Sequence, residues 1–188
     1  NNEADRMTRL VNNLLELSRL DNRETRWDIR PMNPGVILKE VINKMSVNIK
    51  RKGQMLKVSI PEKSPEVFVD KDKIEQVFQN ILSNANKYTP KGGKIIVKLE
   101  HIDKIVKITF RDTGIGIPKE DLPRIFERFY RVDKTRSREM GGTGLGLSIA
   151  REIIQAHNGE IDIDSEPGQG TCVIIRIPAI SPQLARVD

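Results

Sequence analysis

Residues 71–88 read Lys-Asp-Lys-Ile-Glu-Gln-Val-Phe-Gln-Asn-Ile-Leu-Ser-Asn-Ala-Asn-Lys-Tyr, a strongly periodic stretch. Its apolar residues recur at helical spacing and predict one buried helix face, formed by Ile74, Val77, Phe78, Ile81, Leu82 and Ala85. Beside that face runs a polar row: Gln76, Asn80, Asn84 and Lys87. Asn is a poor helix former, so the row is either a solvated face or a set of amide oxygens for a hard cation, next to a positive charge for phosphate. Spacing alone leaves both readings open.

The segments on either side of this helix alternate between helical and strand patterns. Helical spacing predicts further helices over 1–22, 34–52 and about 144–157, and alternation predicts strands over 55–60, 66–70, 94–101, 104–112, 160–165 and 171–178. A loop-rich stretch covers 113–142. Strands that return in hairpins, with helices between them, predict an α/β two-layer sandwich with a mixed, mostly antiparallel sheet covered on one face.

The first helix carries its own apolar stripe, which contains Met7, Leu10, Val11, Leu14, Leu17 and Leu20. An isolated helix of this length is only marginally stable in water, so the stripe needs a partner. That partner is either the globular part of this chain or another helix, and a dimer seam is the more attractive of the two. The polar residues 21–25 then read as a hinge.

A second motif follows the strand over 104–112 and reads Asp112-Thr113-Gly114-Ile115-Gly116. Asp112 is in phase with the apolar residues Val106, Ile108 and Phe110, so a carboxylate ends the inward-facing row. A buried carboxylate requires strong hydrogen-bond partners. The motif is either a turn opened by an Asp or a ligand site in which glycines allow close backbone approach.

A third motif, Gly141-Gly142-Thr143-Gly144-Leu145-Gly146-Leu147, opens directly onto a helix. Backbone N–H groups at the positive end of a helix dipole favour anions, although glycine loops also serve as plain flexible connections. Neither the dinucleotide fingerprint G-x-G-x-x-G nor the loop G-x-x-x-x-G-K-[ST] fits this stretch. Any nucleotide is therefore bound in another way.

The composition sets limits on the class of protein. Lys and Arg exceed Asp and Glu by 32 to 26, a net charge of +6, and no pattern of stacking aromatics accompanies the excess. We therefore expect no nucleic-acid partner, and only residues 124–138 form a basic stretch. The single cysteine, Cys172, excludes an internal disulfide and is expected to be buried in a strand. No apolar run approaches the roughly 20 residues of a membrane span.

Together, and in this order, the motifs resemble the catalytic domain of the sensor histidine kinases, within the ATP-lid superfamily shared with Hsp90, gyrase and MutL. Residues 80–88 look like the N box, 112–117 the G1 box, 125–130 the F box and 142–147 the G2 box, and 168–171 resemble the closing glycine motif. The match covers residues 27–180 and is most similar to the Walk/Vic-type subfamily. Residues 1–26 resemble the end of the dimerisation and phosphotransfer hairpin with its linker, and 181–188 form a tail.

This resemblance implies ATP and Mg²⁺ as cofactors and assigns roles to residues. Asn84 would bind the metal with Asn80 beside it, Lys87 would reach the phosphates, Tyr88 would pack near the adenine, and Asp112 would accept a hydrogen bond from the adenine amine. The base pocket would be lined by Gly114, Gly116 and Ile117. The lid would consist of Gly142, Thr143, Gly144, Leu145, Gly146 and Leu147, anchored by Phe126 and Phe129.

The resemblance also implies the partners of the parent protein. These would be the hairpin of the same protein, a second copy in a homodimer and a response-regulator receiver domain, and the domain would be cytoplasmic within a membrane-anchored parent. The family's phosphoacceptor is a His followed by an acidic residue. Here His101 precedes Ile102 and His157 precedes Asn158. The chain is therefore not expected to phosphorylate itself.

Two other functions remain as alternatives. A hydrolytic ATPase of the same superfamily would need a helix Glu to activate water, and Glu75 is the only nearby acid. A degenerate kinase that serves only as a docking platform would not need intact motifs.

Overall fold

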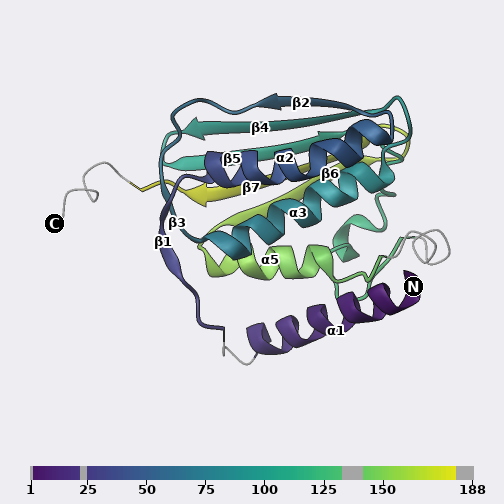
Figure 1. The fold of residues 1–188 in the computed structure, drawn as a ribbon, viewed down its shortest axis with the longest axis horizontal. Coiled ribbons are helices and arrows are strands. Elements are labelled where there is room, and N and C mark those ends of the chain that lie inside the picture. Colours follow the sequence, from purple (N-terminus) through teal and green to yellow (C-terminus); the bar gives the residue numbers. More distant parts are fainter. Residues whose placement is uncertain (1, 22–24, 133–141, 181–188) are drawn as a thin grey trace.

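The computed structural model describes residues 2–21, 25–132 and 142–180, which form a sheet with helices on one face (Figure 1). A five-stranded sheet has the order β2-β4-β5-β7-β6, in which β2 and β4 are parallel and the other pairs antiparallel. Its strands are β2 (Met55–Ser59), β4 (Lys94–Ile102), β5 (Ile105–Asp112), β6 (Glu160–Glu166) and β7 (Gly170–Pro178). The predicted two-layer α/β sandwich is confirmed.

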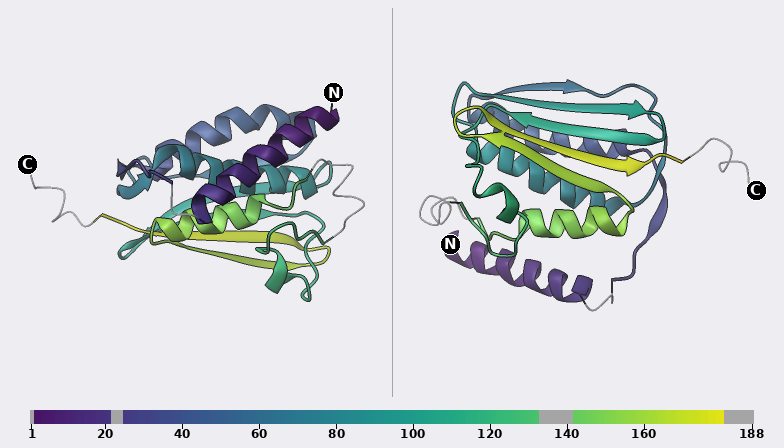
Figure 2. Two further views of the ribbon diagram at one scale, coloured as in Figure 1. Left: turned by 90° about the horizontal axis from the view of Figure 1, so that it is seen from below. Right: turned by 180° about the vertical axis from the view of Figure 1, so that it is seen from behind.

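The helices lie side by side on one face of the sheet, as both views in Figure 2 show. They are α2 (Pro34–Arg51), α3 (Lys71–Tyr88) and α5 (Gly146–Ala156), with α1 (Asn2–Asp21) outside α5 and a short 3-10 helix, η1 (Leu122–Arg124), in the loop region. Side chains cap two of these helices: Asn33 accepts from the N–H of Gly35, and Asp70 accepts from those of Asp72 and Lys73.

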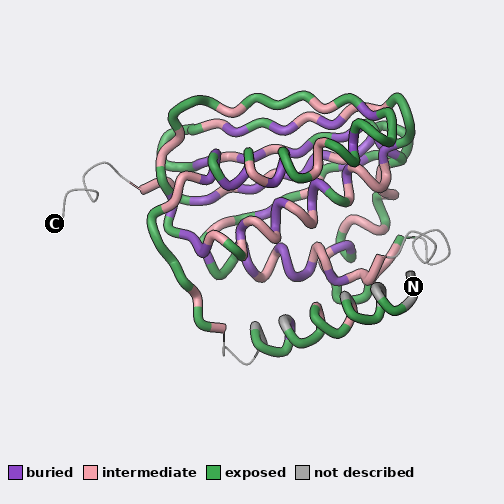
Figure 3. The backbone as a smooth tube through the Cα atoms, viewed as in Figure 1, coloured by how far each residue is buried: buried purple, intermediate pink, exposed green. Residues whose placement is uncertain are grey.

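The core lies between the helices and the sheet (Figure 3). Neighbouring strands place their apolar residues in register, with Val97 opposite Phe110 and Phe110 opposite Val173. The apolar stripe of α3 packs onto this face, where Phe78 meets Phe110 with ring centroids 5.9 Å apart. Burial of each large apolar side chain stabilises the fold by about 1.5–3 kcal/mol. Cys172 is buried in β7, as expected.

Two local features differ from the sequence prediction. The strand expected over 66–70 is β3 (Val67–Asp70), which pairs antiparallel with an unpredicted strand, β1 (Ile29–Met32), in a separate two-stranded sheet. β1 is only four residues long and contains Pro31, so it carries almost no strand pattern. Helix α5 begins at Gly146 because Gly144 has φ +75°, which is not a helical conformation.

The two-stranded sheet is tied to α5 through a buried histidine. The ring of His157 is 3% exposed, its Nε2 accepts from the backbone N–H of Asp70 at 3.0 Å, and its Nδ1 lies 2.7 Å from the carbonyl of Ile153. Trp27 packs edge-on against the ring, with centroids 5.0 Å apart. The predicted place of His157 at a helix C-terminus is confirmed, and its contacts lock the ends of α3 and α5 together.

Helix α1 uses only part of its apolar stripe within this chain. Leu17 is 3% exposed and Leu10 packs against the core, whereas Met7 is 62% exposed and Val11 and Leu14 are also exposed. The globular part therefore covers one edge of the stripe. The predicted hinge over 21–25 falls mainly on residues 22–24, outside the described part of the chain. Within the described ranges, no helix combines the length and apolarity that a membrane crossing requires.

Candidate functional site

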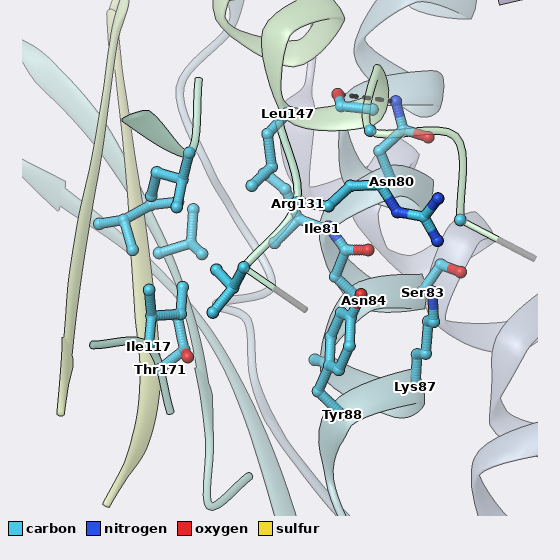
Figure 4. A pocket seen from close by; sticks show the side chains of 18 of the residues that line it. Asn80, Ile81, Ser83, Asn84, Lys87, Tyr88, Ile117, Arg131, Leu147 and Thr171 are labelled. Atoms are coloured by element: carbon cyan, nitrogen blue, oxygen red, sulfur yellow. Dashed lines mark hydrogen bonds between the residues drawn. The ribbon is translucent and has the colours of Figure 1, made fainter. Parts of the chain in front are cut away.

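One cavity of about 400 Å³ brings the three sequence motifs together, between α3, the loop after β5 and the loop before α5 (Figure 4). Tyr88, Asn84 and Asn80 lie along one face of α3, while Ile117 and Thr171 face them from the sheet side. The predicted site residues that line this cavity are Asn80, Asn84, Lys87, Tyr88, Asp112, Gly116, Ile117, Gly142, Thr143, Gly144, Gly146 and Leu147. Gly141 lies outside the described residues.

The other predicted site residues lie beside the cavity and do not line it. Leu145 is fully buried in the core, and Gly114 packs against the carboxylate of Asp112, where an added Cβ would lie 2.6 Å from Oδ1. Phe126 packs against the core with the guanidinium of Arg151 5.2 Å from its ring centroid. Phe129 is 53% exposed, and its backbone packs against Gly144 of the lid, where the N–H of Phe129 donates to the carbonyl of Gly144 at 3.0 Å.

Asp112 ends the inward-facing row of β5 and is 8% exposed. Its Oδ1 accepts from the backbone N–H groups of Gly114 at 2.7 Å and Thr171 at 3.3 Å. Burial raises the pKa of this carboxyl, and the two N–H donors offset part of that rise. Both bonds end on Oδ1, and among the described residues no hydrogen bond reaches Oδ2. The second oxygen can therefore accept from a ligand.

The turn between β6 and β7 packs directly on the loop after Asp112. Gly116 has φ +72°, and a Cβ added there would lie 1.9 Å from the carbonyl oxygen of Glu166. The hydroxyl of Ser165 accepts from the N–H of Ile117 at 2.9 Å. A Cβ on Gly170 would lie 2.0 Å from the carbonyl oxygen of Asp112. These glycines are required because the two backbones touch.

The polar row of α3 faces the loop before α5, so it is not an ordinary solvated face. The amide of Asn80 donates through Nδ2 to the carbonyl of Gly146 at 3.2 Å, which fixes the start of α5 against α3 (Figure 4). Asn84 lines the cavity one turn further on. The ammonium of Lys87 lies 4.9 Å from the ring centroid of Tyr88.

The structure also adds lining residues to which the sequence analysis gave no role at the site. Arg131 lines the cavity and points between Asn80 and Asn84, and its Nε and Nη2 are buried with no hydrogen-bond partner among the described residues. It belongs to the basic stretch 124–138, and that stretch was the sequence signal for it. Lys134, Arg136 and Arg138 of the stretch lie outside the described residues. The other additions to the lining include Asn13, Ser83, Ile115, Tyr130, Ile163 and Val173.

The charges of the cavity are arranged for an elongated anionic ligand. Among the described lining residues, the cations are Lys87 and Arg131 and the only carboxylate is Asp112. At the Asn80 end of the polar row, α5 begins with the small residue Gly146. The first backbone N–H groups of a helix have no partner within the helix, so they can donate to an anion.

Amide oxygens are the protein donors that could hold a metal here. The described residues contain no group of three or more His, Cys, Asp or Glu with metal-site geometry. The amides of Asn80 and Asn84 supply oxygen donors on one helix face. Such a set fits a hard cation that takes its other ligands from water and from a phosphate-bearing ligand.

Comparisons with known proteins agree with this geometry. Residues 69–181 match the family described as histidine kinase-, DNA gyrase B-, and HSP90-like ATPase. The chain is 40% identical over 179 residues to sensor histidine kinase WalK of Bacillus subtilis, and the match covers 94% of this chain and 29% of WalK.

Two solved structures extend the comparison. Full-length ShkA in complex with AMPPNP superposes with a TM-score of 0.81 at 27% identity, over 95% of this chain and 37% of that one. Histidine kinase ThkA in complex with the response regulator TrrA superposes with a TM-score of 0.77 at 26% identity, over 95% of this chain and 49% of that one.

Proposed function

The chain belongs to the histidine kinase-, DNA gyrase B-, and HSP90-like ATPase family, as the ATP-binding catalytic domain of a sensor histidine kinase, and from this premise we propose that its parent protein transfers the γ-phosphoryl group of ATP to a histidine. The chain spans 29% of the length of WalK, so the activity of the whole protein is part of the proposal. One observation carries it: a single cavity has a buried carboxylate, Asp112, and two cations, Lys87 and Arg131, in its lining.

Asp112 selects the base in this proposal. Its Oδ2 accepts a hydrogen bond from the exocyclic amine of adenine, while the bonds to Oδ1 keep the carboxylate in place. Guanine carries a carbonyl oxygen at the same position, which would face the carboxylate acceptor to acceptor. The pocket around the base is completed by Tyr88, Gly116 and Ile117. Gly114 has no side chain that would clash with the carboxylate of Asp112.

The phosphates bind at the other side of the cavity. Lys87 and Arg131 neutralise their charge, and the N–H groups at the start of α5 donate to their oxygens. The buried Nε and Nη2 of Arg131, which have no hydrogen-bond partner in the described part of the chain, support this assignment, because buried donors without a partner gain most from an anionic ligand. ShkA, which has the same fold, was solved with the nucleotide analogue AMPPNP.

Asn84 and Asn80 hold Mg²⁺ in this proposal. The ion, when bound, neutralises and orients the phosphate oxygens. Asn84 offers its amide oxygen from the face of α3 that lines the cavity. Asn80 has its Nδ2 turned to the carbonyl of Gly146, which leaves its Oδ1 as the acceptor toward the ligand.

The phosphoryl acceptor lies on the dimerisation hairpin of the parent. Its imidazole nitrogen forms a bond to the γ-phosphorus while the bond to the bridging oxygen breaks, and ADP leaves. Residues 1–26 are the end of that hairpin with its linker, 27–180 the catalytic domain and 181–188 a tail. The parent is a homodimer anchored in the bacterial membrane with this domain in the cytoplasm, and it passes the phosphoryl group to a response-regulator aspartate. The complex of ThkA with TrrA supports such a partner.

A hydrolytic ATPase is less well supported as a second function. Glu75 would have to activate water, but its Oε1 accepts from Lys44 at 2.6 Å and Gln79 at 2.8 Å. Glu75 is also absent from the described residues that line the cavity. The carboxylate is therefore engaged between α2 and α3.

Calorimetric titration of the chain with ATP and Mg²⁺ tests the proposal. We expect saturable binding of one ATP per chain and at least tenfold weaker binding of GTP, because a hydrogen bond to a charged group contributes roughly 1.5–3 kcal/mol. Equal affinities for ATP and GTP would remove Asp112 as the base-selecting residue, and a chain that binds neither would reject the proposed function.

A further inference from the structure

Helix α1 contributes a side chain to the nucleotide cavity. Asn13, in the middle of α1, lines the cavity, and its Nδ2 donates to the hydroxyl oxygen of Thr143 at 3.3 Å. The two residues are 130 positions apart in the sequence. The motifs of the globular part do not predict this contact, because one of its two partners lies on the amphipathic helix α1, outside those motifs.

The position of Asn13 follows from how α1 docks. Among the described side chains of α1, Leu10 and Leu17 pack toward the globular part. Asn13 lies between them on the same helix face, three residues after Leu10 and four before Leu17. The neighbouring Asn12 is exposed. Docking of the two leucines therefore turns the amide of Asn13 toward the loop.

Thr143 is the point at which this contact can act on the nucleotide site. Its hydroxyl oxygen also accepts from the backbone N–H of Leu145 at 3.4 Å, just before α5 begins. The loop around it contains Gly142, Gly144 and Gly146, and glycine-rich backbone loses much conformational entropy when it is ordered. A hydrogen bond from the docked helix α1 therefore reduces the entropy that remains to be lost when the loop orders around phosphate.

We propose that Asn13 is a positioning residue of the nucleotide site, which holds Thr143 and so prearranges the glycine-rich loop for the phosphates of ATP. Because coupling between two equilibria is reciprocal, ATP binding in turn stabilises the docking of α1 on α5. This inference rests on the proposed ATP-binding function. It gives the helix a direct means of changing nucleotide affinity.

A double-mutant cycle in the full chain tests the inference. ATP and adenosine affinities are measured by calorimetry for the wild type, Asn13→Ala, Thr143→Val and the double variant, together with thermal unfolding of each ligand-free protein. Asn12→Ala is the matched control, since it makes the same change one residue away on an exposed position. Thr143→Ser keeps the hydroxyl and serves as the conservative rescue.

We expect Asn13→Ala and Thr143→Val each to weaken ATP binding roughly two- to tenfold, the usual effect of one hydrogen bond, and the double variant to lose no more than either single variant. Adenosine affinity should not change, and Asn12→Ala and Thr143→Ser should resemble the wild type. If a variant changes the unfolding temperature but leaves the ratio of ATP affinity to adenosine affinity unchanged, the contact only stabilises the fold, and the inference is overturned. Tighter ATP binding by Asn13→Ala would also overturn it. If the wild type itself binds no ATP, the proposed function fails first.

Discussion

The backbone N–H of Gly114 donates to Oδ1 of Asp112 at 2.7 Å, so the loop that follows β5 holds one oxygen of a buried carboxylate. A Cβ on Gly114 would lie 2.6 Å from this same oxygen, which is why the position requires glycine. The N–H of Thr171 reaches Oδ1 from β7. The two bonds fix the carboxylate through Oδ1, and among the described residues none reaches Oδ2.

Asp112→Asn is expected to weaken nucleotide binding without destabilising the ligand-free protein. The amide oxygen can still accept from Gly114 and Thr171, but the amide nitrogen would face the adenine amine donor to donor. ATP and ADP affinities should both fall at least tenfold, since the contact is to the base. Wild-type affinity in calorimetric titration would remove Asp112 from the site.

The ligand-free Asp112→Asn protein should be no less stable than the wild type at pH 7. Burial raises the pKa of Asp112, so this carboxyl favours the folded state most below its ordinary pKa of about 3.9 and loses that contribution as pH rises through the folded pKa. Above the folded pKa the wild type carries a buried charge that the variant lacks. A clear drop in the unfolding temperature of the variant would contradict this account.

Arg131→Ala should weaken ATP binding and leave adenosine binding unchanged. Arg131 lines the cavity, and its buried Nε and Nη2 have no hydrogen-bond partner among the residues that the structure describes. A charge-assisted bond to phosphate contributes roughly 1.5–3 kcal/mol, so a loss of about tenfold or more is expected. Arg124→Ala is the matched control, because that guanidinium is exposed and already paired with Glu127 at 3.2 Å. Equal losses for ATP and adenosine would point to a collapsed site and not to a lost phosphate contact.

Asn84→Ala should lose the part of ATP affinity that depends on Mg²⁺. Asn84 is proposed to meet the triphosphate only through the cation, so adenosine binding should change little. Asn48→Ala, at an exposed position of α2, controls for the substitution in a helix. If the wild type binds ATP equally with Mg²⁺ and with a chelator present, the metal assignment to Asn84 is wrong.

His157 should make stability fall on mild acidification. Burial lowers the pKa of its imidazole, and its Nε2 must stay unprotonated to accept from the N–H of Asp70. The unfolded chain therefore binds the proton more readily, and stability is lost as pH drops below about 6.5 toward the folded pKa. The difference in unfolding free energy between the wild type and His157→Gln should shrink between pH 7 and pH 5. An exposed counterpart, His101→Gln, should follow the wild-type profile.

The sequence predicted those parts of the molecule that depend on local pattern. The stripe of α3 and the alternation in β4 and β5 are periodic, so their bounds followed closely from spacing. β1 was missed, because four residues with a proline are held in place by pairing with β3. The helix motif over 80–88 and the glycine motifs over 112–117 and 142–147 together supply most of the cavity lining.

What the sequence did not predict is how distant segments meet. Arg131 lay within a basic stretch but nothing in the pattern separated it from its neighbours, since only the fold buries its nitrogens. The resemblance gives Phe126 and Phe129 the role of anchoring the lid, but not their contacts: Phe126 packs with Arg151, and the exposed Phe129 donates its backbone N–H to Gly144. Asn13 reaches the loop only because Leu10 and Leu17 dock α1 on the globular part.

Transfer of labelled phosphate from ATP to a separately produced hairpin tests the central claim most directly. The chain is incubated with ATP labelled at the γ-phosphate and Mg²⁺, with and without a dimerisation hairpin that carries its own acceptor histidine. We expect acid-labile, base-stable label on the hairpin alone, formed slowly because separation removes an effective concentration in the mM range. Asn84→Ala should abolish it. His157 is buried with both ring nitrogens engaged and His101 is not among the described lining residues, so label on this chain incubated alone would contradict the account. Failure to label the hairpin despite confirmed ATP binding would contradict the kinase assignment itself.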